Sequence, residues 1–450
     1  MLRSFRVTNH RSIRDEQELL LMPGYEHRLS VLPVTAIFGA NASGKSNLLD
    51  ALRWFQSAVR GSYRSWEADG GIPRRPFRLD ALSGIQPSVF VVDLLIDGVQ
   101  YVYGVELDGT AVLEEWLHSY PHQRKRVIFE RHGQTVELGS TVPEGRGRAD
   151  LLGSLLRENA LLLSTAVQAK QDEVMPVYRW FANSLRFVGT GVIPRLKAEW
   201  AERVITAVDR HPAFTELLKA ADLDITDLRV IETSETPSAL TLAQADRLAA
   251  ELEAREQAAP MEQASPELMR LRQELWLLRR PRTRKEILFL HGPEGIPLAV
   301  EDQSAGTRAW VDLLVTTMDA LESGATLVTD EIDASLHPRL TARLIELFRS
   351  EATNPRGAQL IFTTHDATLL GTTLGEDLLR RDEVWFIEKK GSASSLYPLS
   401  DFHPRKGENR ERRYLSGSYG AVPVVFPDSL VDRLVGLQTE ESGGSDVASA

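Results

Sequence analysis

The stretch VLPVTAIFGANASGKSNLLDALR, residues 31–53, decides the fold. Residues 31–38 are almost all apolar and predict a buried strand, whereas residues 47–60 carry the periodicity of a helix. Between them, GANASGKS (39–46) matches the pattern G-x-x-x-x-G-K-S of a phosphate-binding loop. A glycine-rich turn with an ordinary surface lysine is the competing interpretation, but it does not explain the strand before the loop or the helix after it.

The residue types in this loop suit a nucleoside triphosphate. Gly39 and Gly44 allow backbone amides to turn towards phosphate oxygens at the positive end of the helix. We expect Lys45 to bridge the β and γ phosphates and Ser46 to ligate Mg²⁺. The expected nucleotide-binding residues are Gly39, Ala40, Asn41, Ala42, Ser43, Gly44, Lys45, Ser46 and Asn47.

Composition excludes several other classes of protein. The chain has 450 residues, a hydrophobic fraction of 42% and a formal charge of −11, which favours a folded protein that does not coat nucleic acid over its whole surface. It has no cysteine, so disulfides, thiolate chemistry and zinc–thiolate sites are excluded. We find neither an apolar run long enough to span a membrane nor a signal peptide, and we expect a cytoplasmic protein.

Three carboxylates follow a second apolar run, in LVTDEIDASLHP (327–338). A solvated turn is the ordinary interpretation of such a cluster, but the phosphate loop gives two of the acids a task. Asp330 ends a strand and suits the metal-binding carboxylate, and Glu331 directly after it is placed to polarise an attacking water. We expect Asp333 to cap the following turn or to contact another subunit, without a catalytic role.

Two further sites depend on their position relative to these motifs. Ser304, Ala305, Gly306 and Thr307 precede an amphipathic helix, where a hydroxyl, an amide and the helix N-terminus could face one anion, although Ser-x-Gly before a helix is usually an N-cap. His365 ends the strand of LIFTTHD (360–366), one strand beyond Asp330, where an imidazole could reach a γ-phosphate. A lone histidine at a strand end is otherwise usually structural.

The remaining pattern predicts an α/β protein with an insertion. Residues 88–140 alternate with period two and contain the turn dipeptides Asp97-Gly98 and Asp108-Gly109, which predicts antiparallel hairpins. Strand patterns at 286–300, 325–330, 358–365 and 383–388 alternate with helical runs, which predicts a mostly parallel sheet. We expect residues 1–185 and 286–430 to form two halves of one head, residues 186–285 a helical arm, and residues 431–450 a disordered tail.

Taken together, these motifs resemble the ABC-type ATPase heads of the SMC and RecF class, a P-loop NTPase fold with an antiparallel β subdomain. The opening FRVTNHRSI (5–13) looks like that family's first strand and the Asn-x-x-Ser turn near its nucleotide. PFRLD (76–80), QYVYGVEL (100–107), DEIDASLHP and the stretch 399–423 are similar to bacterial AAA-type defence ATPases of the RloA and AriA kind and to the ATPase half of OLD nucleases. The resemblance covers most of residues 1–185 and 286–425; the arm matches no family.

The resemblance implies roles for individual residues. Gly39 to Ser46 bind ATP with Mg²⁺, Asp330 is the metal carboxylate, Glu331 the catalytic base and His365 the switch histidine. Ser304, Ala305, Gly306 and Thr307 form the signature that is offered to the ATP of another subunit. Ser335, Leu336 and His337 take the place of the D-loop, which contacts the other subunit.

The sequence departs from that family in two places. No glutamine stands clearly at the position of the Q-loop, where Gln86 is the candidate, and the acidic constellation of a Toprim nuclease is absent after residue 370.

The assembly that the resemblance implies is a head-to-tail pair or a higher oligomer that sandwiches ATP.

Two functions remain open for this ATP switch. One is a defence ATPase that controls a separately encoded effector protein; the other is a DNA-binding clamp in repair or maintenance. RRPRTRK (Arg279–Lys285) could contact nucleic acid or an acidic partner, or be a solvated linker. The short arm and the acidic charge favour the defence ATPase. A scaffold with an inactive site is disfavoured because Lys45, Ser46, Asp330 and Glu331 are all present.

Overall fold

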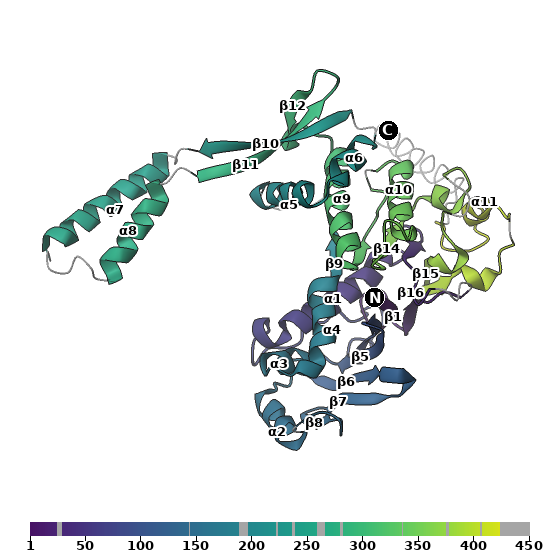
Figure 1. Cartoon of the computed structure of the whole chain (residues 1–450). Coiled ribbons are helices and arrows are strands. Elements are labelled where there is room, and N and C mark those ends of the chain that lie inside the picture. Colours follow the sequence, from purple (N-terminus) through teal and green to yellow (C-terminus); the bar gives the residue numbers. More distant parts are fainter. Residues whose placement is uncertain are drawn as a thin grey trace, which may run out of the picture. The chain divides into compact units, whose positions relative to one another are not determined.

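The chain folds into two compact units, one of residues 1–190 and 320–450 and one of residues 191–319 (Figure 1). The computed structural model describes residues 1–24, 29–143, 145–188, 197–221, 224–235, 239–258, 266–279, 282–334, 336–374, 378–405 and 407–423. The tail expected at residues 431–450 lies outside this range.

A six-stranded sheet forms the centre of the first unit. Its strand order is β16 (Ala393–Pro398), β15 (Val384–Lys390), β3 (Val34–Phe38), β14 (Gln359–Thr364), β13 (Thr326–Thr329) and β9 (Leu185–Val188). All neighbours pair in parallel except β16, which is antiparallel to β15. Because β3, β14 and β13 are parallel neighbours, the loops after them leave at the same edge of the sheet.

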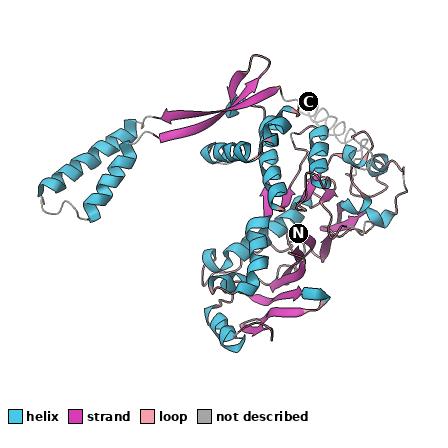
Figure 2. Cartoon of the chain, viewed as in Figure 1, coloured by secondary structure: helices cyan, strands magenta, loops and turns pink. Residues whose placement is uncertain are grey.

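The second sheet of this unit is antiparallel throughout. Strands are drawn in magenta in Figure 2. Its order is β2 (Gln17–Leu20), β1 (Leu2–Thr8), β4 (Ser88–Ile96), β5 (Val99–Leu107), β6 (Val112–Tyr120), β7 (Arg126–His132) and β8 (Thr135–Leu138). Asp97 and Gly98 both have positive φ, 50° and 77°, in the turn between β4 and β5. Two central residues with positive φ match the strand twist of a two-residue hairpin, as the Asp-Gly dipeptide predicted.

Helix α1 (Lys45–Ser65) supplies the apolar face that joins these elements. Its Leu48, Leu52, Phe55 and Val59 are buried in one hydrophobic cluster with residues of both sheets. Phe55 stacks on Tyr103 of β5, with ring centroids 5.3 Å apart, and meets Phe181 edge-on at 5.1 Å. The helix that starts at the phosphate loop is therefore fixed by the core itself.

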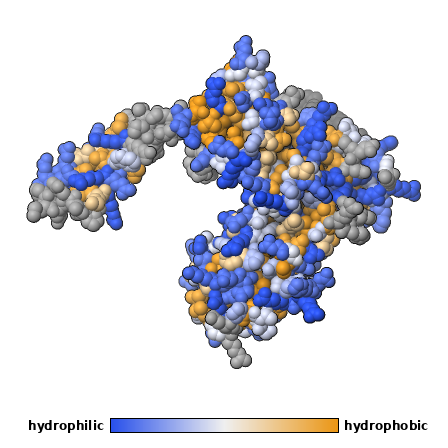
Figure 3. All heavy atoms as spheres, in the orientation of Figure 1, coloured by the Kyte–Doolittle hydropathy of each residue, from blue (hydrophilic) through white to orange (hydrophobic). Residues whose placement is uncertain are grey.

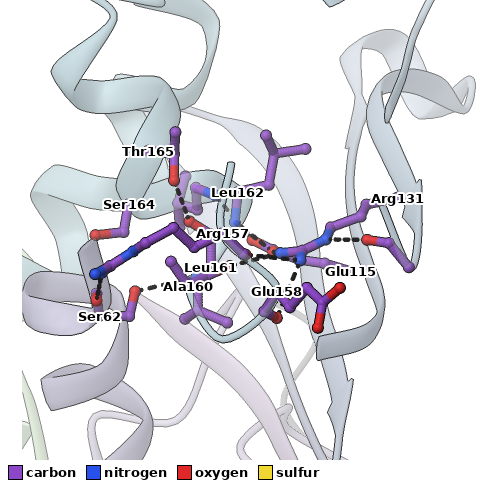
Figure 4. A network of polar contacts seen from close by, with 12 residues as sticks. Ser62, Glu115, Arg131, Arg157, Glu158, Ala160, Leu161, Leu162, Ser164 and Thr165 are labelled. Atoms are coloured by element: carbon purple, nitrogen blue, oxygen red, sulfur yellow. Dashed lines mark hydrogen bonds and ion pairs between the residues drawn. The ribbon is translucent and has the colours of Figure 1, made fainter. Parts of the chain in front are cut away.

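A buried ion pair ties the antiparallel sheet to the helices that follow it (Figure 4). The carboxylate of Glu115 in β6 accepts hydrogen bonds from the amides of Leu162 and Leu163, at 2.5 and 2.8 Å, and lies 3.5 Å from Nη1 of Arg131 in β7. Arg131 in turn donates to the carbonyl of Ala160 at 2.6 Å. Burial raises the pKa of Glu115 and lowers that of Arg131, so each charge depends on the other and on these backbone groups.

Short helices complete the first unit. They are α2 (Gly145–Leu155), α3 (Leu162–Gln168), α4 (Met175–Arg179), α10 (Pro338–Arg349) and α11 (Arg410–Leu415). Arg157, between α2 and α3, donates to the carbonyls of Ser62 and Tyr63 near the end of α1, both at 2.9 Å. The segment between α2 and α3 therefore contacts α1 through Arg157 and the buried Arg131 through Ala160.

The second unit contains a three-stranded antiparallel sheet, β10 (Ile225–Glu235), β11 (Arg282–His291) and β12 (Ile296–Ala299). Helices α5 (Lys197–Arg210) and α6 (Ala213–Lys219) precede it, and α7 (Ala239–Ala258) and α8 (Pro266–Arg279) pack against each other between β10 and β11 (Figure 1). Arg272 pairs with Glu256, and Arg279 with Asp246, across the α7–α8 pair. Figure 3 shows apolar and hydrophilic surface interleaved on this pair.

Two features of this unit depart from the sequence-based expectations. Strand β10 lies within residues 186–285, which were expected to form a helical arm. The strand pattern at 286–300 was assigned to the parallel sheet, but β11 and β12 pair with β10 instead. The reason is long-range: β10 and β11 pair over ten residues on either side of the α7–α8 pair, a partner choice that local periodicity does not encode. Helix α9 (Ala305–Ser323) then leads the chain back into the first unit.

Candidate nucleotide-binding site

The phosphate loop lies between β3, which ends at Phe38, and α1, which begins at Lys45. Gly44 has φ +112°, and a Cβ there would lie 2.1 Å from Oγ of Ser394. A Cβ on Gly39 would lie 2.4 Å from the carbonyl oxygen of Ile387. Both glycines are therefore required by close approach of β15 and β16, and Gly44 also by its backbone conformation.

A chain of hydrogen bonds holds the loop from outside. The Nδ2 of Asn47 donates to Oγ of Ser12 at 2.7 Å, Ser12 and Ser394 share a hydrogen bond of 2.7 Å, and Oγ of Ser394 donates to the carbonyl of Ser43 at 2.6 Å. Since the Ser394 proton is used on Ser43, the Ser12 hydroxyl is the donor to Ser394. Three segments far apart in sequence thus fix the loop backbone.

The turn at Asn9–Ser12 is attached to α1 by charge. His10, fully buried, has its Nε2 2.9 Å from Oδ2 of Asp50, and Nη2 of Arg11 donates to Oδ1 of Asp50 at 3.0 Å. The resemblance had placed this turn near the nucleotide, and its Ser12 does contact the phosphate loop through Asn47.

The two acids after β13 are positioned by one threonine of the neighbouring strand. Oγ1 of Thr363 donates to Oδ1 of Asp330 at 2.5 Å and accepts from the amide of Glu331 at 2.7 Å. The amide of Ile332 donates to the carbonyl of the same threonine at 3.0 Å. Glu331 has φ +49°, a region that costs a side-chain-bearing residue free energy and that these bonds from β14 enforce. The acid therefore has a fixed backbone position at the sheet edge.

His365 connects this acid to the phosphate loop. Its Nδ1 lies 3.1 Å from Nζ of Lys45 and its Nε2 lies 3.3 Å from Oε1 of Glu331. A lysine ammonium can only donate, so Nδ1 is the acceptor and Nε2 is left to donate to the carboxylate. The structure thus brings together Lys45, Glu331 and His365, three residues singled out from separate motifs.

Lys45 is buried inside the loop with all three of its protons used. Nζ donates to the carbonyls of Gly39 at 2.7 Å and Ala40 at 3.1 Å in addition to His365. Burial lowers the pKa of Lys45, while the charges of Glu331, Asp330 and Asp333 act in the opposite direction. A phosphate oxygen that binds here would replace one of the present acceptors and would place a negative charge directly against the buried ammonium.

The side chain of Asp333 contacts the backbone of His365. Its Oδ2 accepts from the amide of His365 at 3.4 Å, and its Oδ1 is buried without a hydrogen-bond partner among the described residues. The expected side-chain cap of the following turn is not formed within the described part of the chain; the amide of Leu336 bonds to the Asp333 carbonyl instead, at 3.2 Å.

The residues present fit a magnesium ion. Ser46 is exposed at the first turn of α1 and offers a hydroxyl, and Asp330 offers a carboxylate whose Oδ1 is oriented by Thr363. Mg²⁺ prefers hard oxygen ligands of this kind and keeps waters and substrate phosphates as its others. Ser46 and Asp330 are therefore the residues that would hold it, and it would neutralise charge on the phosphates.

The expected signature belongs to the second unit. The hydroxyl of Ser304 accepts from the amide of Thr307 at 3.0 Å and shares a 2.9 Å hydrogen bond with its side chain, which makes Ser304 the N-cap of α9. Ser304 and Ala305 are exposed and Gly306 is half-buried. The turn is thus an N-cap, as one of the two interpretations held, and it leaves the helix N-terminus open to solvent.

The positions expected to correspond to the D-loop and the Q-loop are Ser335 to His337 and Gln86. Ser335 lies outside the described residues. Leu336 is half-buried, and Nδ1 of His337 accepts from the amide of Arg339 at 3.2 Å, so this histidine caps α10. Gln86 is exposed, and its backbone carbonyl accepts from Asn9 and Arg74. Thr363 and Ser394 were missed because neither stands in a recognisable motif, and only strand pairing brings them to the site.

A family model described as "AAA domain, putative AbiEii toxin, Type IV TA system" matches residues 34–178 and 199–371 of this chain. The chain belongs to this AAA family. The matched ranges contain the phosphate loop, the signature turn, the acids after β13 and His365, so this AAA protein carries a P-loop ATPase domain.

Other comparisons add little to that assignment. A solved structure of the Smc head domain from Pyrococcus furiosus, with an extended coiled coil and bound to the C-terminal domain of ScpA, covers 89% of this chain and 97% of its own. It shares 13% sequence identity with this chain at a TM-score of 0.39. No curated protein matches. In the described part of the AAA protein, no helix is long and apolar enough to cross a membrane.

Proposed function

We propose that this AAA protein binds ATP with Mg²⁺ and hydrolyses it, with Glu331 as the base that activates water. The observation that carries this proposal is the contact of His365 with both Lys45 and Glu331 at one edge of the central sheet. A kinase has no use for a base that activates water, whereas a hydrolase does. The strained backbone of Glu331, fixed by Thr363, supports a role that demands accurate placement.

The nucleotide acts as a switch between two arrangements of copies of the chain. Ser304 and Ala305 lie exposed at the N-terminus of α9, which suits an anion brought by another copy. A head-to-tail pair, in which the signature turn of one copy meets the ATP of the other, uses both sites. ATP binding then favours the closed pair and hydrolysis opens it, so that occupancy of the site sets the population of each state.

The switch controls a separately encoded effector in antiphage defence. The family description names a putative toxin of a type IV toxin–antitoxin system, which is consistent with a cellular response of this kind. The competing function is an ATP-dependent DNA clamp, for which Arg279–Lys285 would supply phosphate contacts. Within that stretch, residues 280 and 281 and the side chains of residues 282–284 lie outside the described part of the chain.

One experiment tests the catalytic part and separates the two biological roles. Purified wild-type protein, Lys45→Ala and Glu331→Gln would be compared for binding of ATP and GTP, phosphate release and binding to duplex DNA over a salt series. We expect binding to be lost in Lys45→Ala and kept in Glu331→Gln, with phosphate release lost in both. Co-purification of a neighbouring gene product without DNA binding supports effector control; steeply salt-dependent, ATP-dependent DNA binding supports the clamp.

A further inference from the structure

The loop at residues 78–86 exposes three large apolar side chains. Leu79, Leu82 and Ile85 have exposed fractions of 65%, 66% and 77%. They recur every third residue, and the amides of Ile85 and Gln86 bond to the carbonyl of Leu82, which forms a helical turn. Apolar groups that gather at one exposed turn mark an interaction site more often than apolar groups scattered singly.

This loop is held rigidly although its surface is exposed. The Nδ2 of Asn9, itself buried, donates to the carbonyls of Ser83 at 2.7 Å and Gln86 at 2.9 Å. Arg74 donates to the carbonyls of Gln86 and Gly84 at 2.6 and 2.8 Å. A loop whose backbone is already ordered loses little conformational entropy when it binds. The exposed apolar residues are thus presented in one arrangement.

The loop lies beside the nucleotide site. Asn9, which holds it, begins the turn whose Ser12 bonds to Asn47 of the phosphate loop helix. The carbonyl of Arg75 accepts from the amide of Arg11 in the same turn, at 2.7 Å. A partner that covers the phosphates would therefore meet this loop at its edge.

The rim of the loop is basic. Asp50 pairs with Arg11 and Arg75, and Asp15 pairs with Arg14. Asp80, which caps the amides of Leu82 and Ser83, keeps its negative charge, but the arginines around the loop outnumber the aspartates. The exposed Arg78, next to Leu79, adds a further positive charge. In a chain of net charge −11, this combination of apolar and basic side chains fits an acidic, partly apolar surface.

The chain itself offers such a surface, just before the signature turn. Residues 292–303 contain Glu294, Glu301 and Asp302 and no lysine or arginine. All three acids are exposed, and Ile296 at the start of β12 has an exposed fraction of 55%. The 3₁₀ turn η5 (Val300–Asp302) ends two residues before Ser304, so whatever receives the signature turn also meets this acidic strip.

We propose that the loop at 78–86 is one half of the interface between two copies of this chain, and that the strip at 292–303 of the second copy is the other half. The inference rests on the head-to-tail pair of the proposed function and identifies what aligns it. Leu79, Leu82 and Ile85 contact Ile296 of the second copy, and Arg78 faces Asp302. Two-fold symmetry makes the contact twice in each pair.

The test uses the full chain carrying Glu331→Gln, in which ATP and Mg²⁺ accumulate the closed pair, and measures the dissociation constant of the dimer by sedimentation equilibrium. Adding Leu82→Ser with Ile85→Ser is expected to raise this constant about tenfold or more, because anchor residues carry most of the energy of an interface. Leu151→Ser is the matched control, since Leu151 is a leucine of 51% exposure on α2. It should leave the constant unchanged. ATP binding by monomers should be equal in all variants.

Charge reversal gives the second measurement. Arg78→Glu and Asp302→Arg should each weaken the dimer, and the two together should restore it towards the parent. A loop variant that dimerises like its parent, or a double reversal no tighter than either single one, overturns the inference while the ATP-dependent pair stands. A Glu331→Gln chain that stays monomeric with ATP contradicts the pair itself and the interface with it. Loss of a co-purifying protein with an unchanged dimer would assign the loop to a different partner and also overturn the inference.

Discussion

The Nδ1 atom of His365 lies 3.1 Å from Nζ of Lys45, although 320 residues separate them in sequence. Parallel pairing of β14 with β3, in which Thr364 is opposite Phe38, brings the two residues to the same edge of the sheet. The other nitrogen of the imidazole reaches Glu331 at 3.3 Å. Lys45 and the expected base Glu331 are thus connected through one side chain.

Replacement of His365 should separate catalysis from binding. We expect His365→Ala to retain ATP binding and to reduce phosphate release by about a hundredfold, because Glu331 loses the donor that orients it. Steady-state phosphate release and equilibrium ATP binding measure the two effects. His132→Ala is the control, since its imidazole is exposed on β7 and has no contact with the site. Equal turnover in the two variants would show that His365 is only structural.

Gly44→Ala should abolish nucleotide binding. The new Cβ would approach Oγ of Ser394 to 2.1 Å at a φ of +112°, so the loop must shift away from its hydrogen bond with β16. Gly61→Ala is the matched control in α1, the helix that Gly44 precedes, where a Cβ meets only Ser65 at 3.4 Å or more. That control should bind ATP normally and be more stable by about 0.5–1 kcal/mol. ATP binding and thermal unfolding distinguish the two, and normal binding by Gly44→Ala would contradict this account of the loop.

The buried pair of Glu115 and Arg131 should be a large contributor to stability. Glu115→Ala removes the carboxylate that balances the charge of Arg131 and accepts from the amides of Leu162 and Leu163, and we expect a loss of about 3–5 kcal/mol in the free energy of unfolding. Glu114→Ala, its exposed neighbour in β6, should change this free energy by less than about 0.5 kcal/mol. Urea unfolding of both variants checks the contrast. A similar small effect for both would mean that the pair contributes little.

Stability should fall in alkali through Tyr414. Burial raises the pKa of Tyr414 to about 12, above its ordinary value of 10.0, because the folded state disfavours the ionised phenol. This contribution is complete below the unfolded pKa and is lost as pH rises from about 10 to 12. Tyr414→Phe should therefore lose less unfolding free energy over this window, by about 2–3 kcal/mol for a shift of this size. Parallel stability curves of the two proteins would contradict the prediction.

The sequence predicted the site's motif residues because each motif is local. A buried strand, a glycine-rich loop and a helix follow one another within residues 31–53, so the phosphate loop was recognisable without a fold. The family match confirms an AAA-type P-loop domain, and the mixed central sheet agrees with the predicted α/β class. The hairpin at Asp97-Gly98 was likewise predictable, since only its own dipeptide sets the turn.

Contacts between strands that are distant in sequence could not be predicted from local sequence patterns. Thr363 orients both acids and Ser394 supports the loop, yet neither residue type is unusual in a strand. Asp333 was expected to cap a turn or to contact another subunit, and the proximity of its carboxylate to the amide of His365 was not predicted. Strand β10 was missed because its partner β11 lies beyond the whole α7–α8 pair. In each case the deciding partner is far along the chain.

Steady-state phosphate release by wild-type protein and by Glu331→Gln, at saturating ATP and Mg²⁺, tests the central claim most directly. The account predicts measurable turnover in the wild type and a decrease of about 10²–10⁴-fold in the variant, with ATP binding preserved. Glu114→Gln, the same change at an exposed glutamate, should turn over like the wild type. Undiminished phosphate release by Glu331→Gln would contradict the assignment of Glu331 as the base.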